Sequence, residues 1–247
     1  MSDQITFTTV MQGRLATYAM LSRLYRAEMD EASLAEMKKM KCPINTGNTD
    51  VDTGYKLFHR YLSGMWERTL EDLQRDYVKT FIGWNTTGHS AAYPNESVHS
   101  SPERLVMQDA RDEIFAIYRA AGLKSSDNWK MGEDHIAVEL EYMQVECKRA
   151  LEAYEAGDED AATRELLNQY TFITDHLGTW VPFLAKDMLT FAATDFYRAL
   201  AYLTRGFIEV DREFLKNTLA EELDKRGMTA EAATAKPQVA ADTADAQ

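Results

Sequence analysis

Residues 136–154 read IAVELEYMQVECKRALEAY, and their apolar side chains recur every three or four positions, as one face of an α-helix requires. The members of this stripe are Ile136, Leu140, Met143, Cys147, Leu151 and Tyr154. Gly157 follows as a helix stop. Acidic Glu139, Glu141 and Glu146 fall largely off the stripe. The segment predicts an amphipathic helix with one face toward a core.

The same spacing recurs on both sides of this segment. Further helices are predicted around 11–29, 55–62, 70–81, 102–121, 162–177, 181–191 and 196–214, with two of them meeting near Gly178. No period-two alternation or Asn-Gly hairpin signal indicates strands. A chain of 247 residues can bury a core of this kind. The sequence therefore predicts an all-α, single-domain helical bundle over residues 1–227.

Segments rich in Gly, Pro and polar residues separate these helices. We expect connectors at 42–48 and 124–132 and a long loop at 83–101. Ser100 or Ser101 as cap, Pro102 in the first turn and Glu103 in a capping box predict that a helix starts directly after the loop. The composition of residues 228–247 predicts a disordered C-terminal tail.

Composition excludes several classes of function. A net charge of -13 disfavours binding to nucleic acid or to an anionic membrane surface. The N-terminus lacks a signal-peptide pattern, and charges interrupt every apolar run before it could span a bilayer. Cys42 and Cys147 belong to no metal-binding or redox motif, so both are expected to be thiols. We expect a cytoplasmic protein without stable membrane insertion.

Two short motifs could carry chemistry. Glu96-Ser97-Val98-His99 has the Glu-x-x-His spacing of di-metal helical bundles, but it lies in a loop and has no second copy. No phosphate-binding glycine loop occurs. An all-α enzyme that binds a metal or small molecule through His99, His135 or His176 stays as an alternative. We otherwise expect no catalytic residues, no metal and no cofactor.

Glu133-Asp134-His135 opens the helix quoted first. Asp134 is either the helix N-cap or part of a binding site, and His135 then lies in the first turn, where the positive helix end disfavours its cationic form. Asp175-His176 lies at the predicted helix junction, where packing is the default interpretation.

Taken together, the order of these motifs resembles the TorD/DmsD family of redox-enzyme maturation chaperones. The resemblance covers roughly residues 10–215. It rests on Tyr77-x-x-x-Phe81-Ile82-Gly83, Tyr93-Pro94-x-Glu96-Ser97-Val98, Glu133-Asp134-His135-Ile136, Asp175-His176-Leu177-x-x-Trp180 and Phe196-Tyr197.

The resemblance implies a chaperone without catalytic activity. Its partner would be a molybdopterin oxidoreductase of the dimethyl sulfoxide or trimethylamine N-oxide reductase type, whose twin-arginine leader and body it would hold during cofactor insertion, before export. A nitrate-reductase-type assembly chaperone, which shares the fold, is the other alternative. The oligomeric state, monomer or dimer, is left open.

Carried over by the resemblance, the leader-binding residues are Phe81, Ile82, Gly83, Pro94, Ser97, Val98, Asp134 and His135. Asn95 and His99 stand where the family usually has aromatic residues. Trp84 and Tyr93 are therefore added to the predicted site as replacement aromatics, with a different leader as the other explanation.

Overall fold

The computed structural model of this chain describes residues 6–43, 45–83, 90–126 and 128–225, and the regular elements in these ranges are all helical. The elements are α1 (Phe7–Arg26), α2 (Glu31–Lys39), α3 (Thr49–Ser63), α4 (Thr69–Tyr77), η1 (Val78–Ile82), α5 (Glu96–Ser100), α6 (Asp109–Ala120), α7 (Ile136–Glu155), α8 (Glu159–Phe172), η2 (Ile173–Leu177), α9 (Gly178–Phe191) and α10 (Asp195–Lys225). The two η elements are π-helical turns. The predicted all-α bundle is confirmed. The predicted tail, 228–247, lies outside the described residues.

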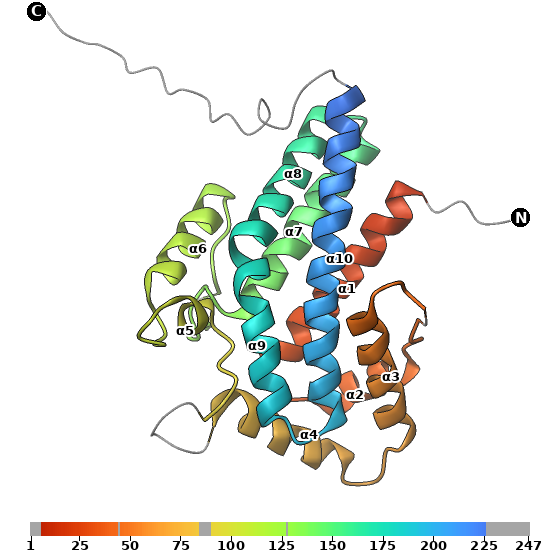
Figure 1. Ribbon diagram of the computed structural model, residues 1–247. Helices are drawn as coiled ribbons and strands as arrows, with labels where there is room; N and C mark the ends of the chain where they lie inside the picture. Colours follow the sequence, from red (N-terminus) through yellow and green to blue (C-terminus); the bar gives the residue numbers. More distant parts are fainter. Residues whose placement is uncertain (1–5, 44, 84–89, 127, 226–247) are drawn as a thin grey trace, which may run out of the picture.

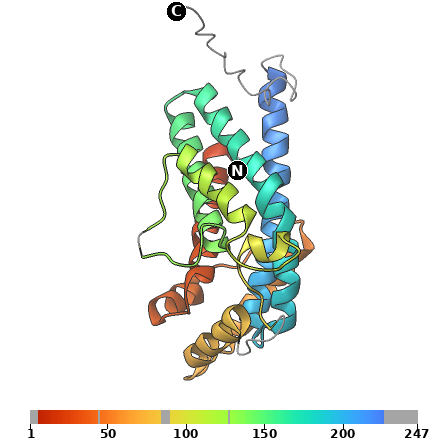
Figure 2. The same ribbon diagram turned by 90° about the vertical axis from the view of Figure 1, so that its left-hand side faces the viewer.

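Four long helices, α1, α7, α8 and α10, run side by side through the body of the molecule (Figure 1). In this body α1 packs on α7, α7 packs on α8, and α10 packs on α8. The lower half of α10 is covered by α3 and α9. The short helix α5 contacts α6 and α9 on one flank, which faces the viewer in Figure 2. This flank carries most of the residues predicted to bind a leader.

The helix quoted first is the centre of the core. Leu140 and Cys147 have no exposed surface, as the stripe predicts. The expectation that Glu139 and Glu146 lie off the buried face is wrong, since both are also fully buried. The reason is that α7 is covered by α1 on one side and by α8 on another. Its buried surface is therefore wider than one apolar stripe.

The helix predicted to start at Pro102 begins only at Asp109. Within the predicted loop, residues 96–100 form the separate helix α5, and the Ser100 hydroxyl donates to the Glu96 carbonyl at 3.0 Å. Ser100 thus ends one helix instead of capping the next. Met107, which falls inside the helix predicted at 102–121, is 50% exposed and has a left-handed backbone.

The junction predicted near Gly178 is a π-helical turn, so α8, η2 and α9 follow one another without a loop. A Cβ on Gly178 would lie 2.7 Å from the carbonyl oxygen of Ile173. Real Cβ atoms essentially never approach so closely, so the wider turn needs glycine here.

The prediction for the two cysteines is also confirmed, since Cys42 and Cys147 are free thiols.

No helix in the described ranges combines the length and the apolarity that crossing a membrane requires.

Candidate functional site

An isolated antiparallel bridge between Asn95 and His135 joins the two segments that carry most of the predicted site. The Glu96 N–H donates to the Asp134 carbonyl, and the Ile136 N–H donates to the Pro94 carbonyl, both at 2.9 Å. Segments far apart in the sequence therefore meet, with Pro94, Ser97, Val98, Asp134 and His135 in one place. All five are buried.

Asp134 holds α5 instead of capping α7. Its carboxylate accepts the Ser97 backbone N–H at 3.0 Å, within the first turn of α5, and the Asn95 side-chain amide at 3.2 Å. Gly132 makes room for this carboxylate, because a Cβ at that position, where φ is +87°, would lie 2.8 Å from Asp134 Oδ1. The interpretation of Asp134 as the N-cap of α7 is wrong, because its carboxylate binds residues that are distant in the sequence.

His135 is the N-cap of α7. Its Nδ1 accepts the Ala137 N–H at 3.1 Å, and its ring meets the edge of Trp129 at 5.0 Å between centroids. Burial, together with the nearby Arg26 guanidinium, lowers the pKa of His135 to about 3, so the imidazole is neutral at physiological pH. The expectation of a neutral ring is met, although burial rather than the helix end is the main cause. His135 is only 1% exposed, so its imidazole is not presented at the surface.

The remaining predicted residues lie where η1 meets the chain entering α5. The Ala92 N–H donates to the Thr80 carbonyl at 2.7 Å, which places residues 80–83 beside 90–94. Phe81 is buried in an aromatic cluster with Tyr25, Tyr77 and Tyr197. Ile82 is 54% exposed. Gly83 and Tyr93 are half-buried. Trp84 lies outside the described residues.

Beneath α5 lies a buried polar cluster that the sequence analysis did not identify. The Glu96 carboxylate lies 3.1 Å from His176 Nδ1, and the Glu139 carboxylate accepts the Trp180 indole N–H at 3.1 Å. Burial raises the pKa of Glu139 well above its usual value, and the Glu96 charge raises it further. The ring of His99 stacks on Trp180 at 5.5 Å. These contacts fix α5 onto α7, η2 and α9.

The same contacts bear on the alternative of a metal enzyme. Glu96 turns toward His176, whereas His99 bonds the Tyr93 carbonyl at 2.9 Å, so the Glu-x-x-His pair does not converge on one point. Across the described part of the chain, no group of three or more His, Cys, Asp and Glu side chains is arranged to hold a metal ion.

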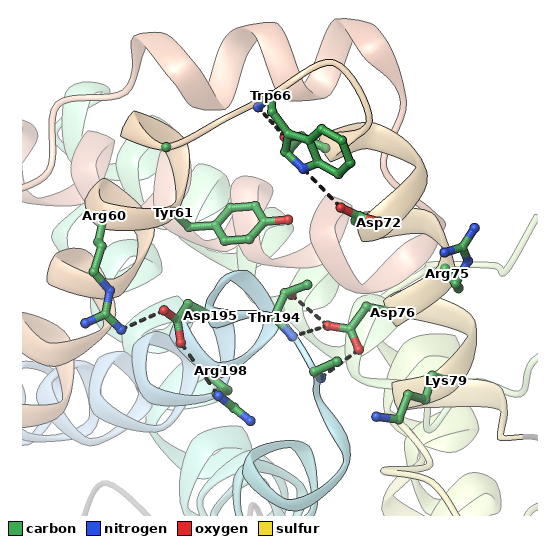
Figure 3. A pocket seen from close by; sticks show the side chains of 13 residues that line it. Arg60, Tyr61, Trp66, Asp72, Arg75, Asp76, Lys79, Thr194, Asp195 and Arg198 are labelled. Atoms are coloured by element: carbon green, nitrogen blue, oxygen red, sulfur yellow. Dashed lines mark hydrogen bonds and ion pairs between the residues drawn. The ribbon is translucent and has the colours of Figure 1, made fainter.

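A cavity of about 750 Å³ lies away from this region, between α3, α4 and the start of α10 (Figure 3). Asp76 closes one wall by accepting the backbone N–H groups of Ala193 and Thr194 at 2.8 and 2.7 Å, just before α10 begins. Asp195 lies between Arg60 and Arg198 and pairs with both. The Asp76 carboxylate therefore binds the backbone just before α10, and the Asp195 carboxylate forms ion pairs at the start of α10. None of the predicted leader-binding residues lines this cavity.

Comparisons with known proteins agree with this architecture. The family described as nitrate reductase delta subunit matches residues 46–186, more than half of the chain. The protein named Chaperone protein TorD of Vibrio cholerae serotype O1 is 27% identical over 150 residues, which cover 61% of this chain and 65% of that protein. Its namesake in Photobacterium profundum is 26% identical over 149 residues, covering 60% of this chain and 68% of that protein.

A longer match extends the likeness beyond that central region. Chaperone protein TorD of Shewanella pealeana is 20% identical over 227 residues, covering 88% of this chain and 96% of that protein. The matches to Vibrio cholerae span just under two thirds of the relatives' own length. All of these relatives are named as chaperones. The chain belongs to the nitrate reductase delta subunit family and, within it, to the TorD/DmsD group of redox-enzyme maturation chaperones.

Proposed function

We propose that this chain is a cytoplasmic chaperone that binds the twin-arginine leader of a molybdopterin oxidoreductase catalytic subunit and assists cofactor insertion before export. The observation that carries the proposal is the convergence around α5. The described residues predicted to bind the leader come from 81–83, 93–98 and 134–135. Backbone hydrogen bonds join 94–96 to 134–136 and place residue 80 beside residue 92. A client of the dimethyl sulfoxide or trimethylamine N-oxide reductase type is what the family resemblance implies.

Burial divides the predicted residues into two roles. Asp134, His135, Ser97 and Val98 are at most 3% exposed, so they act as positioning residues that hold α5 and Trp129. Among the described residues of the predicted site, Ile82, Gly83 and Tyr93 retain exposed surface and are available for direct contact. A leader peptide would therefore bind the outer surface of the framework that the buried residues organise.

Calorimetric titration with a synthetic leader peptide tests the function. The peptide carries two consecutive arginines followed by an apolar helical stretch, and the control peptide replaces both arginines with glutamine. We expect the first peptide to bind at least about tenfold more tightly, since charge complementarity and apolar burial act together. Equal affinity for both peptides, or no binding of either, would contradict the proposal.

A second candidate is an assembly chaperone for a nitrate reductase, favoured by the description of the matching family. The two functions differ in the client. Capture of a nitrate reductase catalytic subunit that lacks a twin-arginine leader, with no affinity for the leader peptide, would favour the second candidate.

A further inference from the structure

Exposed apolar side chains are concentrated on one short part of the chain. Half of the ten large apolar side chains that the described residues expose lie between positions 105 and 131. They are Leu105 (57% exposed), Val106 (48%), Met107 (50%), Phe115 (38%) and Met131 (49%). Single exposed apolar residues are ordinary, but three in succession, at 105–107, mark a surface that another molecule covers.

The segment that displays these residues is held in an uncommon conformation. Arg104 and Met107 have left-handed backbones, with φ of 54° and 61°. Such values are rare for residues other than glycine and persist only where surrounding contacts impose them. Here the Gln108 N–H donates to Ser97 Oγ at 3.2 Å, and the Arg104 guanidinium lies 3.4 Å from the Asp187 carboxylate of α9. Contacts on both sides thus fix the turn that carries Leu105, Val106 and Met107.

Two further contacts bring the exposed residues together. The Met107 Cε atom lies 3.4 Å from where a Cβ of Gly132 would stand, so Met107 lies against the segment that carries Met131. Arg111, one helical turn before Phe115, bonds the Glu133 carboxylate at 2.7 Å and ties α6 to the same segment. We call Leu105, Val106, Met107, Phe115 and Met131 the apolar platform.

Three acidic side chains near the apolar platform in the sequence are available to a partner. Glu103, Asp109 and Glu113 are exposed, and none of them forms an ion pair with another described residue. Arg104 and Arg111, the two cations between residues 103 and 113, are already engaged, Arg104 with Asp187 and Arg111 with Glu133 and Asp112. Arg119 lies over the ring of Phe115 at 5.7 Å. A partner that combines positive charge with an apolar face therefore complements this surface.

We propose that the apolar platform seats the apolar helical stretch of the client leader, with the twin arginines directed toward Glu103, Asp109 and Glu113. This inference rests on the proposed function and adds the surface on which the leader lies. Methionine side chains such as Met107 and Met131 adapt to varied apolar partners, which suits leaders of different sequence. An amphipathic helix laid on an apolar surface is a recurring mode of peptide recognition.

The position of the apolar platform also explains how the buried predicted residues contribute to leader binding. Asp134 accepts the Ser97 backbone N–H, and the Ser97 hydroxyl accepts the Gln108 N–H at the end of the platform turn. Asp134 and Ser97 therefore hold the turn that carries the platform without touching the leader.

The test compares two exposed valines by titrating a fluorescein-labelled peptide that carries two arginines and a Leu/Ala-rich stretch. Val106→Ser should weaken binding several-fold, and Leu105→Ser with Val106→Ser about tenfold or more, as expected for interface anchors. Val210→Ser, on α10 and 45% exposed, is the matched control and should leave the Kd unchanged. Glu103→Gln should weaken binding at low salt and much less at high salt.

The outcomes separate the platform from the proposed function. If the wild-type protein binds the peptide and the platform variants bind it equally well, the platform assignment is overturned while the chaperone function stands. If the wild-type protein does not bind the peptide, both are overturned. If Leu105→Ser with Val106→Ser dissociates a dimer in light scattering and leaves peptide affinity unchanged, the face belongs to a second copy of the chain, and the proposal also fails.

Discussion

Arg14 and Asp211, 197 residues apart in the sequence, form a two-pronged ion pair inside the bundle. Arg14 Nε and Nη2 donate to the two carboxylate oxygens at 2.5 and 2.8 Å, and the Tyr18 hydroxyl donates to the same carboxylate at 2.6 Å. The two side chains are only 5% and 2% exposed. The pair joins α1 to α10 where both are packed against other helices.

Asp211→Ala should lower the free energy of unfolding by about 3–5 kcal/mol, because it leaves the Arg14 charge buried without a partner. Urea denaturation measures the loss. Glu36→Ala removes a partner from the exposed Arg23–Glu36 pair and should cost about 1 kcal/mol or less. Equal effects of the two substitutions would show that burial does not strengthen the core pair.

Asp134→Asn should destabilise the fold by about 1–3 kcal/mol, because an amide cannot accept at both positions where the carboxylate accepts from Ser97 and Asn95. Leader affinity should fall with it, since α5 loses a contact. The control is Asp112→Asn, an exposed position in the first turn of α6. Thermal melts and peptide titration of both variants check this, and a silent Asp134→Asn would show that the contacts to Ser97 and Asn95 contribute nothing to stability or binding.

His135 should make stability depend on pH in the acidic range. The pKa of His135 falls from an ordinary 6.5 to about 3 in the folded chain, so the unfolded chain binds one more proton between these values. The contribution of His135 to the free energy of unfolding is therefore fully present above about pH 6.5. As the pH falls, this contribution declines by up to about 1.4 kcal/mol per pH unit.

His135→Asn removes that titration and keeps a side chain suited to the N-cap. Urea unfolding at several pH values between 4.5 and 7.5 should give the wild type a steeper loss of stability toward acid than the variant. Parallel curves for the two proteins would mean that the imidazole is protonated in the folded state.

Glu139 should act in the opposite direction. Because burial and Glu96 raise the pKa of Glu139, the folded chain holds a proton that the unfolded chain releases above its ordinary pKa of 4.5. The contribution of Glu139 to the free energy of unfolding is therefore lost as the pH rises toward the pKa of Glu139 in the folded chain.

Glu139→Gln is neutral at every pH and keeps an oxygen for the Trp180 indole N–H. The variant should therefore gain stability relative to the wild type between pH 5 and 8. Denaturation curves across this range measure the difference, and a constant difference would show that Glu139 stays ionised when folded.

The sequence predicts the parts of this fold that depend on local spacing. Leu140 lies on a stripe with a period near 3.6 residues, and that period alone places it in the core. Burial of Glu139 could not be read in this way, because it depends on the helices packed around α7 and on Trp180, which is 41 residues away. Likewise, the helix signal at Pro102 is a real local pattern, but the long-range Asp134–Ser97 contact creates α5 before it and displaces the start of α6.

For the candidate site, too, the sequence predicts local features but not those that depend on long-range contacts. The family resemblance names Asp134 and His135, but no pattern in the sequence indicates that both side chains are buried. Met107 falls in the helix predicted at 102–121, because its spacing to Ile114 and Tyr118 is helical, yet the structure exposes it together with Leu105 and Val106. Only the left-handed backbone of Arg104 and Met107 shows that these side chains face outward.

The bridge between Asn95 and His135 also sets the order in which this chaperone becomes competent during its own synthesis. Residues 94–108 emerge from the ribosome first, but the carboxylate that fixes Ser97 belongs to a residue made 37 positions later. Until α7 has started to fold, the segment with Leu105, Val106 and Met107 lacks the contact that shapes it. A nascent or truncated chain would therefore have the apolar residues without the surface, and the proposed leader binding would begin only once the two halves of the chain have met.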